Sequence, residues 1–143
     1  MRGQHIKITS AGLSLADADL QQIFKIKYGD LQSTGWGPRR RHKFDYYQPA
    51  DYYEAVVNKV VRPETRWVDV GGGGDIFPEN RALARELSGR AQRLVGVDPS
   101  DNIETHDILH DHAKVMIEDF DTDERFDLAT LRMVAEHIAD PPA

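Results

Sequence analysis

The sequence of 143 residues contains no cysteine, which excludes disulfide bonds and metal sites built on thiolates. It also lacks a long hydrophobic run, because no stretch approaches the roughly 20 apolar residues of a membrane-spanning helix. Residues 1–7 (MRGQHIK) lack the apolar core of a signal peptide. We therefore predict a cytoplasmic protein that does not act on membranes.

Positive charge is also scarce, since the formal net charge is −6 at pH 7. This balance argues against a general nucleic-acid binder. A basic run at residues 39–43 (RRRHK) could touch RNA, but a solvated loop or internal ion pairing is favoured in an acidic chain. Histidines and aspartates gather at residues 106–112 without zinc-like spacing, which favours a polar loop over a metal site.

Residues 66–75 (RWVDVGGGGD) are the most informative stretch. A short apolar strand runs into four glycines, which lets the backbone approach a ligand closely or, alternatively, forms only a flexible turn. Asp69 lies inside this strand, two residues before the first glycine. Burying an unpaired carboxylate is costly. The pattern therefore predicts a cationic ligand beside Asp69 at the carboxyl end of the strand.

The next segment predicts a helix at 79–87 followed by a strand at 93–97. Pro78 suits the first turn of the helix, and Ser88-Gly89 is expected to end it. Asp98 stands at the tip of the second strand. An acid at this position of a βαβ unit can accept both hydroxyls of a ribose. A simple turn is the alternative interpretation.

Two more strands are predicted at 113–117 and 126–131. Together with the preceding elements they suit an α/β fold, a Rossmann-like doubly wound parallel sheet with crossover helices. Ligands of such sheets bind outside the carboxyl ends of the strands, where the strand order switches. The glycines, Asp98 and Glu118 are expected to converge there.

The acid and glycines resemble the first motif of the class I S-adenosylmethionine-dependent methyltransferases, Asp/Glu-x-Gly-x-Gly-x-Gly. Asp69, Gly71 and Gly73 match its acid and first two glycines, whereas Asp75 stands in place of the third. The resemblance extends over residues 46–143. It includes a Phe-Asp pair at the start of the fourth strand and Glu136-His137 after that strand.

The dinucleotide fingerprint Gly-x-Gly-x-x-Gly is the rival interpretation. Its third glycine falls on Ile76 or on Phe77, depending on which glycine begins the motif. That glycine normally permits close packing of helix on strand. An NAD(P)-binding domain is therefore less favoured than a loop around an amino-acid-like group. A non-catalytic module that binds the cofactor or pairs with a partner also remains open.

The resemblance implies that S-adenosyl-L-methionine is the cofactor and that its sulfonium methyl group is displaced directly by an unidentified acceptor. It names no catalytic residue with certainty: His137 could remove a proton, but a surface or core role is favoured. Met116 replaces the adenine-binding acid of many relatives, so that contact is expected at Glu118, Asp119 or the Ile117 backbone. The cofactor contacts expected in all are Asp69, Gly71, Gly72, Gly73, Asp98, Ile117, Glu118 and Leu131.

The chain is expected to divide into a helical and loop segment, 1–61, and a cofactor-binding half-domain, 62–143. Helices are predicted at 13–26 and 51–61. Family members usually have seven strands in the order 3-2-1-4-5-7-6, and the sequence stops just after the fourth, which implies a sheet in the order 3-2-1-4. We therefore expect an open edge at that strand, satisfied by self-association or by a partner chain, and weak activity of the chain alone.

Overall fold

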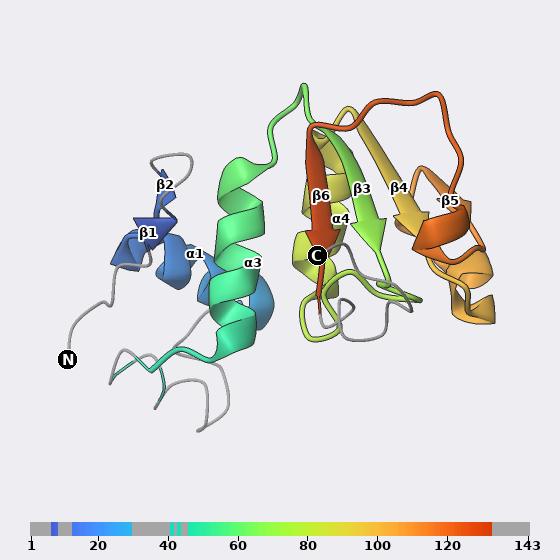
Figure 1. Cartoon of the computed structure of the whole chain (residues 1–143). Helices are drawn as coiled ribbons and strands as arrows, with labels where there is room; N and C mark the ends of the chain where they lie inside the picture. Colours follow the sequence, from blue (N-terminus) through green and yellow to red (C-terminus); the bar gives the residue numbers. More distant parts are fainter. Residues whose placement is uncertain (1–6, 9–12, 30–40, 42, 44–45, 133–143) are drawn as a thin grey trace. The chain divides into compact units, whose positions relative to one another are not determined.

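The computed structural model describes residues 7–8, 13–29, 41, 43 and 46–132 (Figure 1). The chain divides into two compact units, residues 1–60 and 61–143. Among the described residues, no helix has both the length and the apolar character needed to cross a membrane.

The second unit contains a four-stranded parallel sheet. The strands are β3 (Arg66–Val70), β4 (Arg93–Val97), β5 (Asp111–Ala113) and β6 (Leu128–Leu131). Their spatial order is β5-β4-β3-β6, and every neighbouring pair is parallel. This arrangement confirms the predicted Rossmann-like α/β fold, with the first predicted strand between the second and the fourth. The predicted strands at 66–70 and 93–97 have the observed bounds.

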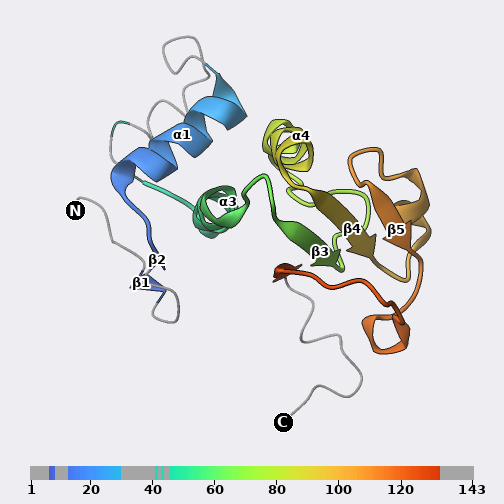
Figure 2. The ribbon, with the colours of Figure 1, turned by 90° about the horizontal axis from the view of Figure 1, so that it is seen from above.

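Different segments lie on the two faces of this sheet. In Figure 2, helix α4 (Arg81–Arg90) lies on one side of β3 and β4, and the 3-10 turn η2 (Ile117–Asp119) lies on the other. Val68 and Val70 pack against Phe120 and Phe126 of the segment around η2. Because side chains alternate along a strand, Asp69 points to the opposite face, together with Trp67.

Helix α4 extends beyond its predicted bounds of 79–87 at the carboxyl end. It begins after Asn80, whose side chain accepts a hydrogen bond from the Leu83 N–H, and it continues to Arg90. Ser88-Gly89 does not end the helix, and that prediction was wrong. The Ser88 hydroxyl donates a hydrogen bond to the Ile108 carbonyl at 2.6 Å. This hydroxyl therefore binds a residue 20 positions away in the sequence and does not stabilise a local turn.

The strand predicted at 113–117 was also wrong. The third strand to pair is Asp111–Ala113, and residues 117–119 form the turn η2. The paired strand ends at Ala113 because its neighbour β4 ends at Val97, directly opposite. The Asp98 N–H still donates to the Ala113 carbonyl at 3.1 Å, and the chain then leaves the sheet. The last strand begins at Leu128, two residues later than predicted.

The first unit holds a short antiparallel pair, β1 (Lys7–Ile8) with β2 (Leu13–Ser14), and two helices. The helices are α1 (Asp17–Tyr28) and α3 (Pro49–Val60). The predicted start of α1 at Leu13 was wrong, because Leu13 pairs in β2 and the Asp19 carboxylate accepts from the Ala16 N–H, which caps the helix later. Helix α3 begins with Pro49, a residue suited to a first turn.

Four charged residues form a cluster between the helices of the first unit. The Lys27 ammonium lies 3.0 Å from both Asp51 and Glu54, and Arg41 forms a second ion pair with Asp51. The side chains of Asp51 and Glu54 are fully buried, and that of Lys27 is 4 % exposed. We call this the buried charge cluster. It shows internal ion pairing for one member of the basic run, Arg41.

Candidate functional site

The glycine loop, residues 71–75, leaves the end of β3 through a backbone path that needs glycine. Gly71 and Gly73 have φ angles of 76° and 57°, which residues other than glycine rarely adopt. The Gly71 N–H donates to the Val97 carbonyl at 2.8 Å, which anchors the loop to β4. A Cβ atom on Gly72 would collide with the Asp69 carboxylate, whose carbon would lie only 3.2 Å away. The loop therefore wraps closely around Asp69.

Asp69 is a buried acid, and its residue is 4 % exposed. Its Oδ1 accepts a hydrogen bond of 2.6 Å from the Thr130 hydroxyl on β6. Burial raises the pKa of Asp69 to about 7; the Thr130 bond opposes this rise and the nearby charge of Asp98 adds to it. Near neutral pH the carboxyl is thus balanced between its two forms, and a nearby cation would favour the charged form.

Asp98 joins the tip of β4 to the glycine loop. Its Oδ2 accepts from the Gly73 N–H at 3.0 Å, and its Oδ1 accepts from the Ser100 N–H at 2.7 Å. The turn interpretation is therefore correct for one oxygen, while the other holds the loop. A carboxylate has about four acceptor positions, and these two hydrogen bonds take up two of them.

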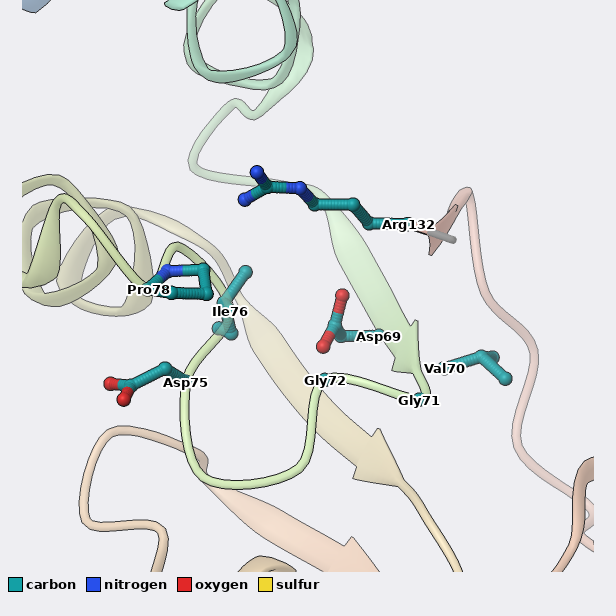
Figure 3. A pocket seen from close by; sticks show the side chains of 8 residues that line it. All are labelled: Asp69, Val70, Gly71, Gly72, Asp75, Ile76, Pro78 and Arg132. Atoms are coloured by element: carbon teal, nitrogen blue, oxygen red, sulfur yellow. The ribbon is translucent and has the colours of Figure 1, made fainter. Parts of the chain in front are cut away.

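A pocket of about 240 Å³ opens beside the end of β3 (Figure 3). In the figure the Asp69 carboxylate points into it, and the Arg132 side chain, from just after β6, extends across it. The lining thus combines a carboxylate with a guanidinium. The complete lining is Asp69, Val70, Gly71, Gly72, Asp75, Ile76, Pro78 and Arg132.

Arg81, in the first turn of α4, fixes the far end of the glycine loop. Its guanidinium lies 2.5 Å from Asp75 and 2.8 Å from Asp107. Asp107 follows the 3-10 turn η1 (Asp101–Thr105), so a single side chain connects the loop, the helix and the segment after β4. Asp75, which replaces the third glycine of the motif, is thereby held at the pocket wall.

The remaining predicted contacts lie at different places. Ile117 packs on the valine cluster of the opposite sheet face, and Glu118 is exposed in η2. Leu131 is 45 % exposed and pairs with Val70 at the end of β6. The structure thus brings Asp69, Gly71 and Gly72 together in one pocket. Next to it, a hydrogen bond joins the Gly73 N–H to Asp98. The Glu136-His137 pair lies outside the described residues.

Sequence reasoning missed two residues of this site, Thr130 and Arg132. Neither stands in a recognisable motif. The available signal was strand register: if 126–131 pairs in parallel with 66–70, a polar side chain on the same face as Asp69 lies beside it. The observed register places Thr130 directly opposite Asp69.

Two of the three histidines predicted to belong to a polar loop, His106 and His110, have structural partners. His110 Nδ1 accepts from the Leu94 N–H at 3.0 Å, and Nε2 lies 2.9 Å from the Ser88 carbonyl, which requires a neutral ring with its proton on Nε2. His106 Nδ1 accepts from the Ile108 N–H at 3.3 Å, and burial lowers the pKa of His106. Within the described ranges, no three histidine or acidic side chains are grouped to hold a metal ion.

Comparison with known proteins gives one match. Residues 39–143 match the profile of a protein family described as methyltransferase domain. The match spans more than half of the chain and includes the glycine loop, Asp69, Asp98 and β6. No curated protein and no solved structure gives a significant match.

Proposed function

The chain belongs to this methyltransferase domain family, and from that premise we propose that it binds S-adenosylmethionine at the glycine loop and transfers the methyl group to an acceptor. The observation that carries the proposal is the Asp69 carboxylate, buried beside the glycine loop and pointing into the pocket. A carboxyl balanced between its two forms near neutral pH is poised to receive a positively charged ligand.

The pocket suits the amino-acid end of the methyl donor. Its volume of about 240 Å³ is below the roughly 300–1,000 Å³ of a complete small-molecule site, so it would accept one end of a larger ligand. Asp69 and Arg132 supply opposite charges on its lining. An α-amino acid carries an ammonium and a carboxylate, which complement these two groups. We assign the ammonium to Asp69 and the carboxylate to Arg132.

The rest of the donor would extend from the pocket toward Asp98. Asp98 is tied to Gly73 of the same loop, so the two acids lie on either side of one short backbone segment. The Asp98 carboxylate, at the tip of β4, would accept hydrogen bonds from the ribose hydroxyls.

The same geometry disfavours a dinucleotide. In a dinucleotide site the glycine turn leads straight into a helix whose N-terminus faces the pyrophosphate. Here α4 begins at Arg81, well past the last glycine, and Asn80 caps it. Asp69 also lines the pocket directly beside the glycines, and its charged form would repel a pyrophosphate held by that loop.

The reaction we propose is a direct displacement. A lone pair of the acceptor attacks the methyl carbon in line with the carbon–sulfur bond, that bond breaks, and its electron pair returns to the sulfonium sulfur. The products are the methylated acceptor and neutral S-adenosylhomocysteine, and the proton of the acceptor passes to solvent or to a base. Because the donor is already activated by its charge, the protein acts mainly by orientation, which can be worth roughly 7–11 kcal/mol.

Titration calorimetry of the full chain against S-adenosylmethionine, S-adenosylhomocysteine and NAD tests the proposal. We expect saturable binding of the first two ligands. Asp69→Asn and Asp98→Ala should each weaken S-adenosylmethionine binding by about tenfold or more, because each removes a charged acceptor. Asp123→Asn, a similar change at an exposed site outside the pocket lining, is the control and should bind like wild type. Binding of NAD without a response to either adenosyl ligand would overturn the proposal.

A further inference from the structure

Thr130 occupies a buried position between Trp67 and Asp69. The Trp67 indole N–H donates to Thr130 Oγ1 at 2.8 Å, and Thr130 Oγ1 lies 2.6 Å from Asp69 Oδ1. All three residues are buried, with exposures of 0 %, 5 % and 4 % in the order Trp67, Thr130, Asp69. They come from two strands that pair in the sheet, β3 and β6.

The direction of this chain of hydrogen bonds is fixed by chemistry. An indole N–H can only donate, so Thr130 Oγ1 must accept from Trp67. The single hydroxyl proton of Thr130 is then available for Asp69. Trp67 therefore holds the hydroxyl so that its proton faces the carboxylate.

The consequence falls on the second oxygen of Asp69. With Oδ1 occupied by Thr130, Oδ2 faces Gly72, the position where an added Cβ would collide with it. The terminal torsion of a free aspartate has broad energy wells, so an unheld carboxylate could rotate. Held at one oxygen, it presents the other to the glycine loop and the pocket.

We propose that Thr130 is a positioning residue for the methyl donor: its hydroxyl, held by Trp67, donates to Oδ1 of Asp69 and so aims Oδ2 of that carboxylate at the cationic end of the ligand. This inference rests on the proposed function for the identity of the ligand. Thr130 itself need not touch the ligand, because it acts through Asp69. Its role is not evident from the glycine motif, which names only the acid.

The charged groups around Asp69 also influence the pKa of its carboxyl. Asp98 approaches from the end of β4, and its charge raises the pKa of Asp69. Asp75 from the glycine loop and Arg132 from beyond β6 line the same pocket, and Arg81 of α4 is paired with Asp75. Against burial and Asp98, the Thr130 hydroxyl lowers the pKa of Asp69. Removing that hydroxyl should therefore shift the carboxyl toward its protonated form.

The first experiment measures S-adenosylmethionine affinity by calorimetry from pH 6 to pH 9. Thr130→Val keeps the shape of the side chain but removes the hydroxyl, whereas Thr130→Ser keeps the hydroxyl. We expect Thr130→Val to bind about tenfold or more weakly at pH 7, with much of the loss recovered at high pH, and Thr130→Ser to resemble wild type. A loss in Thr130→Val that is equal at every pH, or that Thr130→Ser shares, would show a purely structural role and overturn the inference.

The second experiment needs no ligand. The pH dependence of the ¹³C signal of the Asp69 carboxyl, assigned by its absence from Asp69→Asn, reports the carboxyl directly. Its midpoint should rise in Thr130→Val and return in Thr130→Ser; an unchanged midpoint would overturn the inference. If Thr130→Val fails to fold, Trp67→Phe, which frees the hydroxyl to rotate, replaces it in both experiments and should shift the midpoint in the same direction.

The two proposals fail in different ways. Wild-type protein that binds no S-adenosylmethionine at any pH would refute the proposed function, while the carboxyl signal would still test the link from Thr130 to Asp69. Wild-type binding with a Thr130→Val variant that matches it at every pH would leave the proposed function intact and refute the positioning role.

Discussion

Asp69→Asn should make the ligand-free protein more stable, and increasingly so as the pH rises. The pKa of Asp69 is raised from 3.8 to about 7 by burial. Each tenfold change in proton affinity corresponds to about 1.4 kcal/mol, so ionising this carboxyl in the folded chain costs about 4 kcal/mol more than in the unfolded chain. Asparagine keeps an oxygen that can accept the Thr130 hydroxyl but carries no charge.

The sign follows from proton binding. Below about pH 4 the carboxyl is protonated in both states and contributes no penalty. As the pH rises toward 7, the unfolded chain releases its proton and the folded chain retains it, so wild type loses stability, and above about pH 7 the loss is complete. Between pH 5 and pH 8 the advantage of Asp69→Asn over wild type should grow by about 3 kcal/mol.

Urea unfolding at pH 5 and pH 8, at constant ionic strength, measures this difference. Trp67 is fully buried in the second unit, and its fluorescence in a Trp36→Phe background would report the unfolding of the unit that contains Asp69. Titrating groups far from Asp69 are common to both proteins and cancel in the comparison. A difference in unfolding free energy that is the same at both pH values would refute the assignment of Asp69 as a destabilising buried charge.

Three further changes have expected outcomes. Gly72→Ala should weaken S-adenosylmethionine binding and lower the free energy of unfolding by about 1–3 kcal/mol, because the added Cβ would collide with the Asp69 carboxylate. Gly74→Ala is the control: the nearest neighbour of its Cβ would be 3.8 Å away, so it should change stability far less. Acidification below about pH 6.5 should destabilise wild type relative to His106→Asn, because burial lowers the pKa of His106 and the folded chain resists protonation there; urea midpoints that run parallel with pH would contradict this. Lys27→Met should destabilise the first unit by about 3–5 kcal/mol, as judged by thermal unfolding, because it leaves buried carboxylates without that cation, and the exposed Lys25→Met is its control.

The central strands and the glycine loop could be predicted because their signals are local. β3 and β4 are short runs that are largely buried on both faces, as expected of inner strands of a parallel sheet. Each ends at a residue that breaks the pattern, Gly71 or Asp98. The strand order then followed from the resemblance to a known family.

The errors occurred where a distant contact decides the local structure. β5 consists of Asp111, His112 and Ala113, and nothing in these letters favours a strand. It forms because β4 offers an unpaired edge of matching length. In the same way α4 continues through Ser88 because a carbonyl from another segment accepts its hydroxyl. Thr130 and Arg132 were missed for the related reason that only strand register reveals their neighbours.

The buried charge cluster has a consequence for how the sequence of the first unit can change. Its two cations, Lys27 and Arg41, face two acids, Asp51 and Glu54, so the four formal charges sum to zero. Replacing one of these residues by a neutral side chain leaves a net charge in a buried place, which is costly. Replacing one cation and one acid together keeps the balance. The cluster should therefore accept substitutions in pairs of opposite charge and resist them one at a time.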